Sequence, residues 1–161
     1  MKSIPPNLRS QRGAGLIEVL VSVVILAIGL LGMAGLQASA LRGNQSSYAR
    51  SQAVMLSYYM LDMMRADRAR ALLGDYNTDN NATPDAVLTP ICNATDVPQD
   101  TLADNTREDW LLAVKANLGD NAQTCGAIRC AATGECTIQI TWDDARAGGD
   151  GQQRFETRSR L

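Results

Sequence analysis

The chain has 161 residues, enough for one small domain and one long helix. Its formal net charge is -2, it has no histidine, and beyond the first thirteen positions it carries 12 basic and 17 acidic residues. An acidic bulk does not suit a nucleic-acid-binding protein, which needs clustered positive charge. Without histidine, the Ser-His and Cys-His arrangements of nucleophilic enzymes are excluded, and we expect neither enzymatic activity nor a cofactor.

The first element is a segment over residues 14–36 that is apolar throughout except for Glu18 and Ser22. As a helix of roughly 34 Å, it is long enough to span a membrane. The basic residues before it predict that the N-terminus stays in the cytoplasm and that the rest of the chain lies on the far side. They are Lys2, Arg9 and Arg12.

Two ordinary interpretations of this segment, a cleaved secretory signal peptide and a plain membrane anchor, leave Glu18 unexplained. Ala38-Ser39-Ala40 resembles a signal-peptidase site, but the apolar run is longer than that of a secretory signal peptide and contains a carboxylate. In a plain membrane anchor, a carboxylate would cost about 2.5–3.5 kcal/mol at mid-membrane, although less this close to an interface. An acidic residue in a membrane span usually has a partner and a function.

The residues around Glu18 fit a third interpretation. Gln11-Arg12-Gly13-Ala14-Gly15-Leu16-Ile17-Glu18 resembles the processing site of type IV prepilins, in which a short basic leader ends in glycine and the fifth residue after it is glutamate. That family most often has phenylalanine or methionine where Ala14 stands. The resemblance implies that a membrane peptidase cuts after Gly13 and methylates the amine of Ala14. It also implies that Glu18 pairs with the positive N-terminal amine of an adjacent subunit.

Two longer stretches narrow the resemblance to one kind of minor pilin. VLVSVVILAIGLLGMAGLQ (residues 19–37) and MLDMMRADRARALLGDYN (residues 60–77) are similar to the family of type IV pilus modification proteins, PilV. The resemblance implies a structural or priming subunit near the pilus tip. Its implied partners are other minor and major pilins, the prepilin peptidase and the inner-membrane pilus assembly machinery.

The same resemblance implies a precursor that crosses the inner membrane once, with its C-terminal domain in the periplasm, before it joins the pilus. A type II secretion pseudopilin shares the processing motif and stays an alternative. A pilus-associated receptor for DNA uptake or adhesion is an alternative of another class, although the acidic connection after the helix argues against binding to nucleic acid.

The absence of proline between Pro6 and Pro84 allows one helix over residues 14–73, ended by Gly74. Apolar side chains recur near helical spacing in its second half, and we expect them to form a core face under a sheet. They are Leu41, Tyr48, Met55, Tyr59 and Met63. The predicted organisation is a cleaved leader over 1–13, a helix over 14–73 whose part 14–36 spans the membrane, and a globular domain over 74–161.

The remainder predicts a small sheet and one more helix. Residues 75–106 indicate a long irregular connection, and because 75–86 only partly match a calcium loop, a solvated loop without metal is the better interpretation. Thr106 resembles the N-cap of a helix. Period-two alternation predicts strands near 127–131, from 136 to 142 and over 154–161. The expected fold is α+β, with the long N-terminal helix packed against a small antiparallel sheet.

Four cysteines lie in the C-terminal half, at Cys92, Cys125, Cys130 and Cys136. No Cys-x-x-Cys pair is present, so disulfides in an oxidising compartment are a better interpretation than a four-thiolate zinc site. Four cysteines allow three pairings. Cys130 and Cys136 flank the predicted turn between two strands and can face each other, which would leave Cys92 to join Cys125.

Overall fold

The structure, a computed structural model, describes residues 15–79, 87–145, 148 and 151–161. The chain divides into two compact units, one up to Ala40 and one from Leu41 to Leu161. Helix α1 (Leu16–Ala66) contributes residues to both units, and the second unit contains the other helices and strands of the described residues. The globular unit therefore includes the C-terminal part of α1 and begins well before residue 74.

The long helix predicted over residues 14–73 is present with one interruption. Helix α1 ends at Ala66, and α2 (Arg68–Leu73) follows after Asp67, whose φ of -116° and ψ of 50° are not helical. Gly74 ends α2 as predicted. Its φ of 88° lies in the left-handed region that glycine adopts without strain, and its N–H donates to the Ala71 carbonyl at 3.1 Å.

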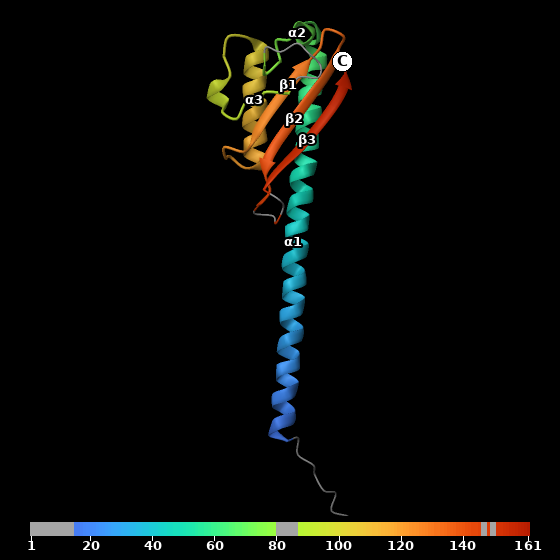
Figure 1. Cartoon of the computed structure of the whole chain (residues 1–161), viewed down its shortest axis with the longest axis vertical. Helices are drawn as coiled ribbons and strands as arrows, with labels where there is room; N and C mark the ends of the chain where they lie inside the picture. The colour runs from blue at the N-terminus through green and yellow to red at the C-terminus, as the bar shows by residue number, and fades with distance from the viewer. Residues whose placement is uncertain (1–14, 80–86, 146–147, 149–150) are drawn as a thin grey trace, which may run out of the picture. The chain divides into compact units, whose positions relative to one another are not determined.

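Three strands form one antiparallel sheet in the order β1-β2-β3, which confirms the predicted α+β class (Figure 1). They are β1 (Cys125–Cys130), β2 (Glu135–Asp143) and β3 (Gln152–Arg160), each within two residues of its predicted bounds. Ile138 and Ile140 of β2 are fully buried, whereas the intervening Gln139 is partly exposed. The alternation in the sequence thus reports a strand with one buried face.

Helix α3 spans Leu102–Leu118, so the prediction that Thr106 is its N-cap is wrong. The N-cap is Thr101, which forms a capping box with Asp104. The Thr101 hydroxyl accepts from the Asp104 N–H at 3.1 Å, and the Asp104 carboxylate accepts from the Thr101 N–H at 3.1 Å. Because Asp109 follows Thr106 by the same three positions, the local pattern alone does not distinguish the two threonines.

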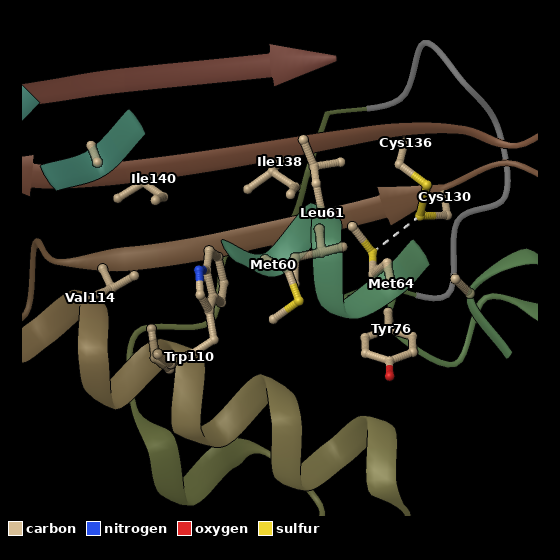
Figure 2. Packing of buried hydrophobic residues seen from close by; sticks show 14 of the residues in the cluster. Met60, Leu61, Met64, Tyr76, Trp110, Val114, Cys130, Cys136, Ile138 and Ile140 are labelled. Atoms are coloured by element: carbon tan, nitrogen blue, oxygen red, sulfur yellow. Dashed lines mark hydrogen bonds between the residues drawn. A yellow bond between two sulfur atoms is a disulfide. The ribbon is translucent and has the colours of Figure 1, made fainter. Parts of the chain in front are cut away.

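The core of the globular unit lies between the sheet and the helices α1 and α3 (Figure 2). Met60, Leu61 and Met64 of α1 and the ring of Trp110 of α3 are buried against the sheet. The Trp110 indole N–H donates to the Leu56 carbonyl at 3.0 Å and so connects α3 to α1. This bond gives the buried indole a partner and fixes the two helices to each other.

The apolar stripe predicted as the core face of the helix is exposed instead. Its members, called here the outward stripe, are 36–64% exposed; they are Leu41, Tyr48, Met55, Tyr59 and Met63. The face that packs under the sheet begins with Ala53 and Ser57, both fully buried. These small side chains allow α1 to approach its neighbours closely, and the Ser57 hydroxyl donates to the Ala53 carbonyl at 2.8 Å. Since methionine occurs on both faces, hydrophobicity alone does not identify the buried one.

The outer edge of β1 is covered by the segment that follows α2. The Thr78 N–H donates to the Ile128 carbonyl at 2.9 Å, and Ile91 forms an isolated antiparallel bridge to the same strand. Asp79 forms an ion pair with Arg129 of β1, and each side chain is only 5% exposed. The stretches at Thr78, Asp79 and Ile91 are therefore docked on the sheet, whereas most of residues 93–100 are exposed to solvent.

Asp104 makes the stability of the globular unit sensitive to acid. Burial alone would raise the pKa of its carboxyl group, but hydrogen bonds from Thr101 and Arg107, with the charge of Arg107, hold that pKa below the ordinary value of 3.8. The stabilisation is therefore complete above the ordinary pKa and is lost as the pH falls through lower values. We expect Asp104→Asn to lower the free energy of unfolding at neutral pH by about 2 kcal/mol. The variant should also depend less on pH below about 4 in denaturation experiments, and equal acid slopes would contradict this account.

Candidate functional site

The N-terminal half of α1 is apolar on all sides. Every residue from Leu16 to Leu36 is exposed in this chain, and aliphatic side chains such as Leu26 and Leu31 are 63% and 73% exposed. Among the described residues, α1 is the one helix whose length and composition would let it cross a membrane. A helix without a polar face requires an apolar environment, which a bilayer or a bundle of similar helices provides.

Glu18 lies in the first turn of this helix. Its backbone N–H donates to the Gly15 carbonyl at 2.9 Å, and its carbonyl accepts from the Ser22 hydroxyl at 2.7 Å. Within the described residues, the Glu18 carboxylate has no hydrogen-bond or ion-pair partner. The partial positive charge of the helix N-terminus favours an acid at this position. The carboxylate nevertheless remains available for a cation from outside the described chain.

Gly13 and Ala14, the other two residues of the predicted processing site, lie outside the described residues. The described chain begins just after them, at Gly15. Cleavage after Gly13 and methylation of Ala14 therefore stay predictions from the sequence.

The structure joins the four cysteines in the pairing that the sequence favours. Cys92 is bonded to Cys125 across a sequence separation of 33 residues, and Cys130 to Cys136 across a separation of 6. The first bond fastens the segment before α3 to β1, and the second closes the hairpin of β1 and β2. All four thiols are used in this way, which leaves no thiolate to bind zinc.

In residues 75–86, which partly match a calcium loop, the described carboxylates form ion pairs with arginines. Asp75 pairs with Arg70 at 2.9 Å, and Asp79 pairs with the buried Arg129. The rest of that loop, residues 80–86, lies outside the described part of the chain. The two described acids therefore fasten the segment to α2 and to β1.

The apolar segment and its acid also carry a recognisable motif. Residues 8–34 match the family model described as the prokaryotic N-terminal methylation motif, and the match covers Gly13, Ala14 and Glu18. The chain carries the N-methylation motif of prepilin-like proteins. This motif is that of the type IV pilin and pseudopilin class, and the fold agrees with a pilin-like arrangement of a long helix on a small sheet. Neither a curated protein nor a solved structure matches the chain.

The outward stripe is an exposed apolar surface that the sequence pattern alone does not identify. It was expected under the sheet, yet Tyr48 and Met55 are 63% and 54% exposed, and the neighbouring Tyr58 is 56% exposed as well. The one indication in the sequence is that the stripe contains no small side chains. The buried face of α1 contains Ala53 and Ser57, which allow close packing. In the globular unit, α1 therefore presents a second apolar surface.

Proposed function

We propose that the chain is the precursor of a minor pilin of the type IV pilus, of the PilV kind, and that it acts by assembly rather than by catalysis. One observation carries the proposal: Glu18 places a carboxylate in the first turn of α1, within an exposed segment from Leu16 to Leu36 whose other side chains, apart from that of Ser22, are apolar. The methylation motif over residues 8–34 supports the class. The similarity of residues 60–77 to PilV proteins supports a minor pilin as the member of this class.

In this proposal, neighbouring subunits pack their apolar helices together and remove Glu18 from water. A buried carboxylate without a partner costs several kcal/mol, so it must meet a positive group. The amine of Ala14 in the adjacent subunit, released by cleavage after Gly13, provides that group. Because only one axial offset between helices brings amine and carboxylate together, the pair sets the register of assembly. The outward stripe supplies further apolar surface for packing against neighbouring pilins.

The same proposal places the precursor in the inner membrane with its N-terminus in the cytoplasm and its globular unit in the periplasm. The basic residues before the apolar segment support this orientation. The two disulfides support it independently, since such bonds form and persist in oxidising compartments.

A type II secretion pseudopilin is the second candidate, because the methylation motif is common to both kinds of protein. The proteins that co-purify with the chain from membranes separate the two candidates. Pilus subunits as partners support the minor pilin, whereas secretion-system subunits would move the assignment to the pseudopilin.

Processing provides the direct test. The intact mass of the membrane-extracted protein is expected to equal that of a chain beginning at Ala14, with the added mass of one methyl group. Gly13→Ala should leave a precursor of full length in the same experiment. A mature chain beginning at Leu41, after Ala38-Ser39-Ala40, would establish ordinary signal cleavage and exclude the pilin assignment.

A further inference from the structure

The exposed charges of the globular unit are unevenly distributed, with acids in excess on one side and arginines on the other. Residues 94–120, called here the acidic flank, contain the 3-10 helix η1 (Ala94–Asp96) and α3, with six acids and two basic residues. Both basic residues are occupied within the flank: Arg107 pairs with the buried Asp104, and Lys115 pairs with Asp120 at 2.8 Å. The exposed charges that remain are acidic, among them Asp96, Asp100 and Asp109.

The opposite charge gathers on α1, α2 and β3. Residues 41–73 and 152–160, called here the basic flank, contain eight arginines and three acids. All eight guanidinium side chains belong to exposed residues; they are Arg42, Arg50, Arg65, Arg68, Arg70, Arg154, Arg158 and Arg160. The basic flank thus has a net charge of five positive, against four negative on the acidic flank.

The two flanks lie toward opposite edges of the sheet. Helix α3 packs on β1 and β2, whereas β3 is the strand at the other edge (Figure 1). The Arg65 guanidinium donates to the Ser159 hydroxyl at 3.1 Å, which joins α1 to β3 within the basic flank. In a two-fold dimer both subunits use the same surface, so two complementary surfaces on different sides of a molecule cannot both be buried. They can both be buried when each copy binds the next through two different surfaces.

The basic flank also has a hollow that could receive an acidic surface. An open depression of about 470 Å³ lies at the end of β3, where Arg158, Ser159 and Arg160 of the flank line it. Thr133 and Glu135 of the β1–β2 hairpin line its other side, and the charge of Glu135 is not included in that of the flank. The guanidinium of Arg68 stands beside it, 3.8 Å from where a Cβ on Gly134 would lie. Arg158 contacts Glu156 at 3.2 Å in a largely exposed pair, and such pairs exchange partners at little cost.

We infer that the basic flank of one copy binds the acidic flank of a second copy that lies beside it. The interface joins two different surfaces, so each copy can use one flank for each of two neighbours. This inference rests on the proposed function, in which copies or similar pilins lie next to one another. Complementary charge at exposed surfaces chiefly raises the rate of encounter and selects the partner. The apolar helices would hold subunits together, and the flanks would decide which globular units become neighbours. Nucleic acid is a poorer occupant, because none of the described residues that line the hollow is aromatic and could stack on a base.

Charge reversal in the full-length chain tests the inference. Arg158→Glu with Arg160→Glu, or Asp100→Lys with Asp109→Lys, is expected to reduce co-purification of two differently tagged copies at low salt by about tenfold. In the chain with all four substitutions the altered positions of the two flanks carry each other's sign of charge. The flanks are complementary again at these positions, and this chain is expected to associate. High salt should weaken association of the parent chain and of the fourfold variant alike. If neither reversal changes association, or if the fourfold variant fails to recover, the inference is overturned.

A charge-preserving variant supplies the control and a map of the contact. Arg158→Lys with Arg160→Lys keeps the charge and provides amines that a carbodiimide joins to touching carboxylates. In a mixture of isotope-labelled and unlabelled chains, we expect crosslinks between copies that join the end of β3 to the peptide containing Asp100 and Asp109. DNA binding by the parent chain without such crosslinks would overturn the inference in favour of a nucleic-acid surface. Because these assays use detergent-extracted protein without pili, their failure would leave the role of Glu18 untouched.

Discussion

The Glu18→Ala chain is expected to insert into the membrane and to be cleaved after Gly13, yet to be nearly absent from pili. Insertion should persist or improve, because the segment becomes more apolar. Incorporation should fail, because the amine of the adjacent subunit loses its counter-charge in the apolar core. Breaking a buried pair costs about 3–5 kcal/mol, which corresponds to a loss of incorporation of about a hundredfold or more. Immunoblots of sheared pili and of membranes measure the two fractions.

Two other variants separate the charge pair from a general effect on the helix. Ser22→Ala removes the other polar side chain of the apolar segment, whose hydroxyl, among the described residues, donates to the Glu18 carbonyl alone, and this variant should reach pili at the parent level. Gly13→Ala should also be depleted from pili, but as an uncleaved precursor whose leader covers the amine. Incorporation of Glu18→Ala at the parent level would show that the charge-pair mechanism is wrong, whichever family the chain resembles.

Gly126→Ala is expected to lower the free energy of unfolding of the globular unit by about 3 kcal/mol. A Cβ at this position of β1 would lie 2.4 Å from Cζ3 of Trp110 and 2.5 Å from its Cη2, far inside van der Waals contact. The ring has little room to move, since Trp110 is 1% exposed and its indole N–H is bonded to the Leu56 carbonyl. The added methyl group must therefore displace α3 or β1. Thermal unfolding followed by near-ultraviolet circular dichroism measures the loss, because Trp110 contributes to that signal.

Gly43→Ala is the matched control, because it adds the same methyl group at a glycine of α1 whose Cβ would meet nothing within 4 Å. It should stabilise the chain by up to about 1 kcal/mol through higher helix propensity. A Gly126→Ala chain as stable as the parent would show that Trp110 does not pack against β1 as described.

The sheet could be predicted closely because its strands alternate visibly and its hairpin is marked by cysteines. Cys130 and Cys136 stand on either side of a tight turn, so the pairing of the strands and of the thiols follows from the same residues. Two failures, the N-cap of α3 and the outward stripe, concern choices that only tertiary contacts make. Thr101 and Thr106 are each followed by an acid three positions later, and the buried Arg107 that pairs with Asp104 is visible only in the folded chain.

The second failure, the outward stripe, has a related cause. The sequence shows which residues of α1 share a face, but not which face the sheet will cover. The buried face combines the small Ala53 and Ser57 with Met60, Leu61 and Met64, so apolar content does not distinguish it from the stripe. For the candidate site, the methylation motif could be recognised from the spacing of its residues, because glycine, acid and apolar run must coincide in one short segment, whereas the roles of Gly13, Ala14 and Glu18 stay predictions. The partner of Glu18 could not, since it belongs to another molecule in the proposed assembly.

The two disulfides imply an order of events when the reduced chain first folds. Cys130 and Cys136 close a short loop, whereas Cys92 must find Cys125 across 33 residues, and the chance of encounter falls with loop length. Cys125 and Cys130 are closer still in sequence, but as the two ends of β1 they are held about 16 Å apart once that strand is extended. Hairpin formation within microseconds therefore protects against the wrong bond. We therefore expect the hairpin to be locked first and the segment that carries Cys92 to be fastened afterwards to a sheet that already exists.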